Sequence, residues 1–134
     1  MNNKSKGTAF EKEFAQWLSE KGFWAHLMQD NQNGQPFDLL AAKNGETYVI
    51  DCKDCNGKIF RLSRIEENQR TAMRLWQETG NREGLFAIRF QNQIYLAGFQ
   101  WLEHLRKTGR KQVQEEDCKN YGEEALSWIN KRWK

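Results

Sequence analysis

The sequence predicts an α+β domain in which helices pack on a mixed sheet. Three observations lead to this fold class. A run with helical apolar spacing comes first, three strand-like runs separated by turn residues follow, and a second helix then precedes another pair of strands. The chain has 134 residues, enough for one compact core and too few for two. We therefore expect a single domain over residues 1–134.

The first third of the chain predicts one helix and three strands. A helix is expected at 7–21, because Phe10, Phe14 and Leu18 recur at helical spacing. The strands are expected at residues 23–28, 37–42 and 47–53. Turn residues at 30–35 and at 43–46 separate these runs. Since Asn44-Gly45 is typical of a hairpin, the three strands should form an antiparallel meander.

A second helix follows the meander. Ser63 and Glu66 match a capping box, which predicts a helix from Ser63 to about Glu78. Gln69 falls within its apolar stripe, where a buried amide needs polar partners. The remaining predicted elements are strands at 85–90 and 93–97, a helix at 100–107, an irregular polar stretch at 111–121 and a helix at 123–133.

The composition narrows the class of protein. No apolar run approaches the roughly 20 residues that cross a bilayer, and the first residues lack the apolar stretch of a signal peptide. Three cysteines predict no disulfide framework, so we expect a cytoplasmic protein without membrane contact. The net charge of +3 is a weak argument for nucleic acid. Basic residues nevertheless cluster after the third strand, around residues 106–111 and at 131–134.

Two aspartates and a lysine predict a metal-dependent phosphodiesterase site. Asp51 and Lys53 lie two apart in a strand and therefore share one face, while Ile50 and Cys52 point to the other. Asp38 lies in the preceding strand. Carboxylate oxygens suit Mg²⁺, and such an ion can activate water next to a phosphodiester. We expect Asp38, Asp51 and the Cys52 backbone carbonyl as ligands, with Lys53 stabilising developing negative charge.

Two helical residues are candidates for the same site. Glu11 borders the apolar stripe of the first helix, so it could add a metal ligand or hold a metal-bound water. Gln69 points inward from the second helix and could position Lys53, a water or a phosphate. Each residue also has an ordinary explanation: Asp51 and Lys53 as a surface ion pair, Glu11 as helix surface and Gln69 as a satisfied core amide.

The sequence does not support other kinds of site. Cys52 and Cys55 form a lone C-x-x-C, and zinc requires four ligands. Cys52 alternates toward the core, which favours a buried thiol. His26 and His104 show no partner pattern, and the sequence contains no phosphate-binding loop.

Four ordered motifs resemble the PD-(D/E)xK nuclease superfamily, and within it the Holliday junction resolvases of archaeal and RecU type. They are Lys6-Gly7-Thr8-Ala9-Phe10-Glu11, Pro36-Phe37-Asp38-Leu39-Leu40-Ala41, Tyr48-Val49-Ile50-Asp51-Cys52-Lys53 and the segment from Phe60 to Arg70. The resemblance implies a restriction-endonuclease-like core at about residues 4–102, with residues 103–134 as a C-terminal helical extension. It also implies that Glu11, Asp38, Asp51, Lys53 and Gln69 are the catalytic set.

The same resemblance implies a homodimer that depends on Mg²⁺ or Mn²⁺ and makes paired nicks in four-way DNA junctions. Residues expected to bind DNA are Lys4, Lys6, Lys58, Arg61, Arg64 and Arg70. Asp51 replaces the commoner glutamate, and the segment before Pro36 is too short for the stalk that RecU-type enzymes insert into junctions. The predicted function is a metal-dependent, structure-selective DNA endonuclease. A nuclease of the same fold on other DNA, restriction-like or for repair, and a catalytically inactive DNA-binding module stay open as alternatives.

Overall fold

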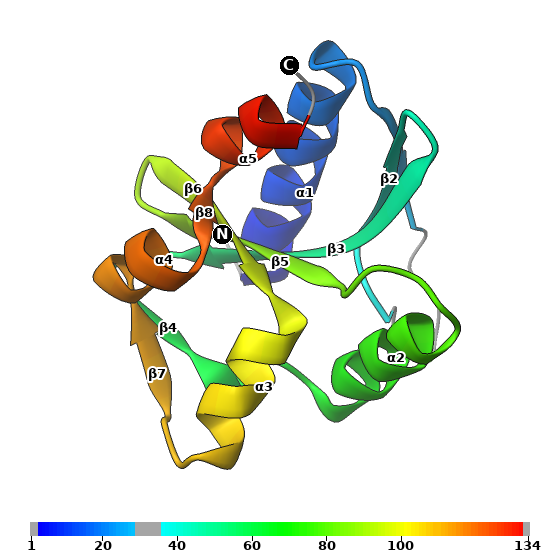
Figure 1. Cartoon of the computed structure of the whole chain (residues 1–134). Helices are drawn as coiled ribbons and strands as arrows, with labels where there is room; N and C mark the ends of the chain where they lie inside the picture. Colours follow the sequence, from blue (N-terminus) through cyan, green and yellow to red (C-terminus); the bar gives the residue numbers. More distant parts are fainter. Residues whose placement is uncertain (1–2, 29–35, 133–134) are drawn as a thin grey trace.

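The computed structural model describes residues 3–28 and 36–132, with side chains from residue 9 onward. The predicted turn at 30–35 and the side chains of Lys4 and Lys6 lie outside the described residues. A central sheet separates helices on its two faces (Figure 1). The helices are α1 (Asn3–Glu20), α2 (Glu67–Glu78), α3 (Phe99–Lys107), α4 (Glu115–Tyr121) and α5 (Ala125–Arg132), with a short 3₁₀ helix η1 (Leu62–Arg64).

The main sheet has six strands in the order β1-β2-β3-β5-β6-β8, and a separate small sheet pairs β4 with β7. The strands are β1 (Trp24–Leu27), β2 (Leu39–Lys43), β3 (Glu46–Cys55), β4 (Ile59–Arg61), β5 (Leu85–Phe90), β6 (Gln93–Gly98), β7 (Gln112–Gln114) and β8 (Glu123–Glu124). β3 and β5 run parallel, with Asp51 opposite Phe86, while the other neighbouring pairs of the main sheet are antiparallel. The sheet is therefore mixed, as predicted.

The predicted meander is present in β1, β2 and β3. Asn44 and Gly45 have φ angles of 53° and 83°, the left-handed backbone that a two-residue hairpin turn of the primed type requires. This turn sets Lys43 opposite Glu46, and the register then runs to Leu39 opposite Ile50. Leu39 is the first residue of β2, so from Asp51 onward β3 extends past the edge of this neighbouring strand.

Each face of the main sheet carries its own core. One core joins α1 and α5 to the sheet residues Ile50 and Cys52. The other contains Met73 of α2, together with residues of α3, α4 and the β4–β7 sheet. Residues 51 and 53 alternate with 50 and 52, so they belong to the face that α2 covers.

Two predicted elements are wrong in detail. Ser63 is not a helix cap, because it lies in η1, and α2 begins at Glu67 with Glu66 as its N-cap. The 3₁₀ turn allows Leu62 and Ile65, 3% and 5% exposed, both to enter the core before the helix starts. The stretch at 111–121 is not irregular, since it forms β7 and α4.

The ends of other elements also shift. α1 begins at Asn3 rather than Gly7, and the last helix begins at Ala125, because Glu123 and Glu124 form β8 at the sheet edge. The segment after residue 102 therefore contains strands as well as helices, and α3 crosses the predicted boundary between core and extension. Among the described residues, no helix is both long and apolar enough to cross a membrane.

Candidate active site

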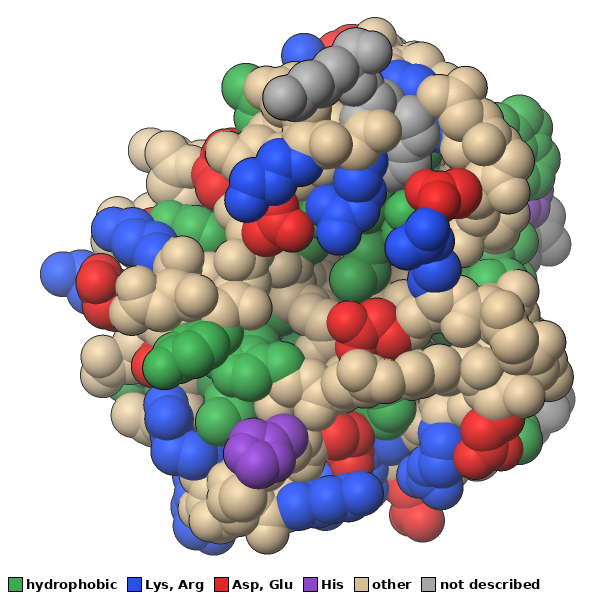
Figure 2. Space-filling view, in the orientation of Figure 1, with side chains coloured by type: hydrophobic (Ala, Val, Ile, Leu, Met, Phe, Trp, Pro, Cys, Tyr) green, Lys and Arg blue, Asp and Glu red, His purple; other side chains and the backbone are tan. Residues whose placement is uncertain are grey.

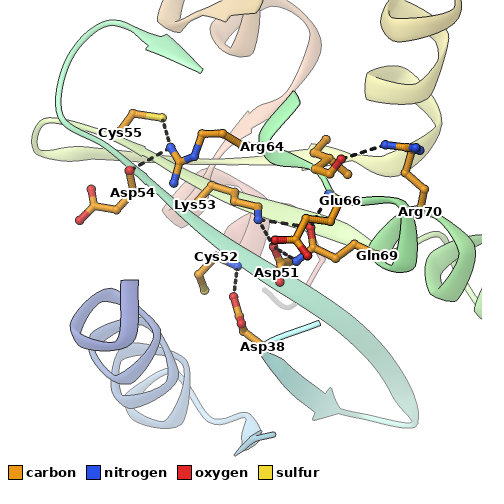
Figure 3. A network of polar contacts seen from close by, with 11 residues as sticks. Asp38, Asp51, Cys52, Lys53, Asp54, Cys55, Arg64, Glu66, Gln69 and Arg70 are labelled. Atoms are coloured by element: carbon orange, nitrogen blue, oxygen red, sulfur yellow. Dashed lines mark hydrogen bonds and ion pairs between the residues drawn. The ribbon is translucent and has the colours of Figure 1, made fainter. Parts of the chain in front are cut away.

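Asp51, Lys53 and Gln69 form a closed network on the α2 face of the sheet (Figure 3). Lys53 Nζ lies 3.0 Å from Asp51 Oδ2 and donates to Gln69 Oε1 at 3.2 Å. Gln69 Nε2 donates to the same Asp51 oxygen at 3.1 Å. The predicted inward direction of Gln69 is thus confirmed, and its amide joins the two strand residues that sequence spacing placed on one face.

The start of α2 holds this amide in place. Gln69 occupies the third position of the helix, and its Oε1 also accepts the backbone N–H of Glu66 at 3.1 Å. Both halves of the amide are therefore used, oxygen by two donors and nitrogen by one acceptor, which fixes its orientation. The sequence prediction missed Glu66 as the cap, although a Gln three residues after an acid could have signalled it.

Asp38 reaches the site from the residue just before β2. Its backbone N–H donates to Ile50 O at 3.1 Å, and its carbonyl accepts Met28 N–H at 2.8 Å, so the chain is anchored on both sides. Its Oδ2 accepts the backbone N–H of Cys52 at 2.7 Å. That N–H is available to Asp38 because β2 has ended and leaves this edge of β3 unpaired.

Asp51 is buried and Asp38 is partly buried, and the surroundings of both disfavour the ionised carboxylate. Burial, opposed by Lys53 and assisted by the neighbouring Asp38, raises the pKa of Asp51 to about 7. Burial likewise raises the pKa of Asp38 to about 6, against the stabilising Cys52 N–H. Asp51 is 1% exposed, and its Oδ1 has no hydrogen-bond partner among the described residues. An unpaired buried carboxylate oxygen is costly and needs a physical explanation.

Glu11 approaches the site from the other side of the sheet. α1 packs on the face of Ile50 and Cys52, opposite to Asp51 and Lys53. Glu11 is nevertheless close enough to Asp38 to raise the pKa of that carboxyl. Across the described part of the chain, no three His, Cys, Asp or Glu side chains gather closely enough to hold a metal ion. The acids thus meet in pairs, with Asp38 at the sheet edge between Glu11 and Asp51.

Cys52 presents its backbone to the candidate site, while its thiol points into the opposite core. Its side chain is 7% exposed and belongs to the α1 core, and burial raises the pKa of the thiol well above its usual range. In an extended strand the N–H and C=O of one residue point to the same edge. The Cys52 carbonyl therefore faces the edge where Asp38 lies, as expected for a backbone ligand. All three cysteines are free and buried.

The residues predicted to bind DNA separate into groups. Lys58 is exposed beside the β4–β7 sheet. Arg64 donates to the Asp54 carbonyl at 3.0 Å and lies over the Phe60 ring. Arg61 and Arg70 line one cavity next to the site. The same cavity is lined by Arg106, Arg110 and Lys111, which the sequence prediction treated only as a charge cluster.

A family model for archaeal Holliday junction resolvases (Hjc) matches residues 2–121. The chain belongs to this family. A solved structure of Archaeoglobus fulgidus Hjc, a Holliday junction resolvase from an archaeal hyperthermophile, is similar at a TM-score of 0.70 and 19% identity, over 92% of this chain and 99% of that chain. At this identity the likeness shows the shared fold. A comparison with curated protein sequences finds no match.

Membership in the Hjc family confirms three predictions. The resemblance to junction resolvases is correct, the mixed α/β fold is that of the Hjc structure, and the protein is a Holliday junction resolvase nuclease. A nuclease of this family acts on DNA junctions, and such nucleases generally use a divalent metal. The ion itself, the oligomeric state and the roles of individual residues belong to the proposal below.

Proposed function

We propose that this resolvase cuts four-way DNA junctions by a divalent-metal-dependent reaction at Asp38, Asp51 and Lys53. The observation that carries the proposal is Oδ1 of Asp51, a buried carboxylate oxygen that has no hydrogen-bond partner among the described residues and lies next to a second acid and a lysine. Family membership supplies the substrate class. The residue roles are supported by the contacts of the described side chains.

The donor set fits a hard cation. Asp51 Oδ1, the Asp38 carboxylate and the Cys52 carbonyl offer oxygen from adjacent positions around one sheet edge. Mg²⁺ commonly binds through one or two carboxylates, several waters and substrate phosphates, so two acids suffice and a third side chain is not required. When bound, a divalent ion polarises the phosphate and lowers the pKa of a coordinated water. We propose Mg²⁺ or Mn²⁺, because the ligands are oxygens and the Cys52 thiol is buried in the opposite core.

Contacts with Asp51 and Gln69 fix the position of the Lys53 ammonium. It is 12% exposed and is bound by Asp51 Oδ2 and Gln69 Oε1. A cation at Asp51 would weaken the attraction of that carboxylate for Lys53, and the ammonium could then meet negative charge developing on the phosphate. Gln69 would keep the lysine from leaving the site, which makes it a positioning residue in this scheme.

Glu11 has the least direct role among the proposed residues. It is partly buried on α1 and acts electrostatically on Asp38. From that place it could hold a water bound to the metal rather than the metal itself. Arg64 and Lys58 remain proposed DNA contacts, as do Lys4 and Lys6.

We propose that the enzyme acts as a homodimer. A two-fold protein presents two equivalent sites, and a four-way junction offers two nearly equivalent strands for paired nicks. The three free cysteines support a proposed location in the reducing cytoplasm. Sedimentation of the purified chain, alone and with junction DNA, tests the dimer directly.

The decisive experiment compares cleavage of a four-way junction with cleavage of a linear duplex of the same sequence. The wild type should cut the junction in Mg²⁺ or Mn²⁺ and stay inactive in EDTA. Lys53→Ala should abolish cutting, whereas Lys119→Ala, a change of an exposed lysine on α4, should preserve it. Equal cutting of both substrates would favour a nuclease on other DNA. If the wild type cuts neither substrate, with or without metal, the result would favour an inactive binding module.

A further inference from the structure

A cavity of about 670 Å³ lies beside the proposed active site and gathers positive charge. It is formed between η1, the start of α2 and the turn that joins α3 to β7. Five cationic side chains line it: Arg61, Arg70, Arg106, Arg110 and Lys111. Two acids, Glu66 and Glu67, line it as well, so the cavity carries an excess of positive charge.

Tertiary pairing creates this cavity from segments far apart in the chain. β4 and β7 pair antiparallel, with Arg61 opposite Gln112. Leu62 N–H donates to the Lys111 carbonyl at 3.0 Å, which extends the pairing past the end of both strands. Arg61 and Lys111 are thereby brought to the same rim, although 50 positions separate them in the sequence.

The cations differ in how they are paired. Arg70 and Arg106 share Glu103, at 3.7 Å and 2.8 Å, and Arg110 contacts Asp117 at 3.0 Å. The side chains of Arg61 and Lys111 have no hydrogen-bond or ion-pair partner within the part of the chain that the structure describes. Both are exposed. Two uncompensated cations at one rim are free to meet an external anion.

The charge excess is local rather than general. The net charge of the whole chain is +3. On the face shown in Figure 2, most Lys and Arg side chains lie next to Asp or Glu, so positive and negative charges alternate there. An excess within one cavity therefore distinguishes it from the mixed surface of that view.

The cavity and the proposed active site share a wall. Glu66 lines the cavity, and its backbone N–H holds the Gln69 amide that contacts Asp51 and Lys53. Arg70, the next residue of α2, turns to the cavity side and donates to the Ile65 carbonyl at 2.9 Å (Figure 3). A DNA strand whose scissile phosphate lies at Lys53 would thus carry its neighbouring phosphates over Arg70 and into the cavity.

We propose that this cavity binds the phosphodiester backbone of the cleaved strand next to the scissile bond, with Arg61 and Lys111 as direct phosphate ligands. The proposal rests on the proposed function, because it takes the site at Asp51 and Lys53 as the place of cutting. It assigns DNA binding to the α3–β7 turn, outside the motifs that carry the family resemblance. Arg106 and Arg110 contribute charge while remaining tied to Glu103 and Asp117.

The salt dependence of binding tests the assignment. A junction with short arms is titrated with protein in EDTA at several salt concentrations, for the wild type and for Arg61→Ala with Lys111→Ala. The double variant should bind about tenfold more weakly at low salt. The slope of log affinity against log salt should become shallower by about 2, since each lost phosphate contact removes about 0.9. In Mg²⁺, the midpoint of cleavage against protein concentration should shift by the same factor.

Two matched variants separate a phosphate contact from other effects. Arg61→Lys with Lys111→Arg keeps the charges and should restore the wild-type slope. Lys21→Ala with Lys131→Ala removes the same charge at the opposite end of the molecule, near the ends of α1 and α5 (Figure 1), and should leave affinity and slope unchanged. Lys111→Gln alone should give half the slope change, which keeps the test available if the double variant folds poorly.

The outcomes distinguish this proposal from the one it rests on. Unchanged affinity, or weaker binding with an unchanged slope, would overturn the cavity as a phosphate site, even while Lys53→Ala still abolishes cutting. Conversely, a wild type that never cuts would refute the proposed function. The slope difference would then still report whether phosphates occupy the cavity.

Discussion

Two ionic networks lie close together on β3, and they differ in how completely their carboxylates are paired. Both oxygens of Asp54 contact Arg89, at 3.2 Å and 2.7 Å, and Arg89 also reaches Glu13 of α1 at 2.7 Å. Asp51 pairs through Oδ2 with Lys53 and Gln69, while its Oδ1 has no partner among the described residues. One network is balanced and the other leaves charge unsatisfied.

The pKa values show the consequence of this difference. The hydrogen bonds that Arg89 donates to Asp54 raise the pKa of Arg89, which reinforces the charged state of that pair. Burial instead raises the pKa of Asp51 to about 7, since Lys53 compensates only part of the cost of ionising the carboxylate there. A network that serves only the fold tends to satisfy its members. The cation proposed above would relieve this imbalance at Asp51.

The largest expected difference between the two networks is in the rate of junction cleavage. We expect Asp51→Asn to lower the single-turnover rate of junction cleavage by about 10³-fold or more, because it removes a proposed metal ligand. Asp54→Asn makes the same chemical change three residues along the strand and should alter the rate only a few-fold. Equal losses in both variants would mean that Asp51 has no special role.

In EDTA, the network of Asp38 and Asp51 should make the stability of the protein depend on pH, and the network of Asp54 should not. The pKa values of Asp38 and Asp51 are raised from 3.8 to about 6 and about 7, so their contribution to stability is full below pH about 4. This contribution to the free energy of unfolding, on the order of a few kcal/mol, is lost as the pH rises through 6 and 7. Thermal melts from pH 4 to 8 should show this decline in the wild type and in Asp54→Asn. The decline should be smaller in Asp51→Asn, where only Asp38 still titrates in this way, and an undiminished decline there would count against the assignment.

Metal should stabilise the protein through the incomplete network alone. Mg²⁺ or Mn²⁺ at a hundred times its dissociation constant would add about 2.7 kcal/mol to the free energy of unfolding. We expect this shift in melts of the wild type and of Asp54→Asn. It should disappear in Asp38→Asn with Asp51→Asn, while junction binding in EDTA persists. A shift that survives in this double variant would place the ion elsewhere.

The smallest expected effect concerns the balanced network. Arg89→Ala removes the partner of Asp54 and Glu13 and the contact of the guanidinium with the Phe10 ring, 4.3 Å from its centroid. Because Glu13 is 63% exposed and Asp54 17%, the free energy of unfolding should fall by only about 1–2 kcal/mol. Urea titration measures this loss. The cleavage rate of the folded variant should match that of the wild type. A large loss of rate would mean that the Arg89 network is also needed for cleavage.

Local pattern was sufficient for much of the fold and for the centre of the site. The two-residue period of β3 placed Asp51 and Lys53 on one face and Cys52 on the other, as the two cores confirm. Helical spacing likewise directed Gln69 inward. Asn44-Gly45 predicted the hairpin because only a few residue types tolerate its left-handed backbone. Each of these inferences depends on neighbours within a few residues.

Long-range contacts settled the remainder, because no local pattern records which distant segments will meet. β4 and β7 are three residues long and exist through pairing across about fifty positions, so 111–121 read as irregular. The start of α2 moved from Ser63 to Glu66 because burial of Leu62 and Ile65 outweighed a matching cap motif. The place of Glu11, across the sheet from Asp51, follows from the packing of α1 on the Ile50 and Cys52 face.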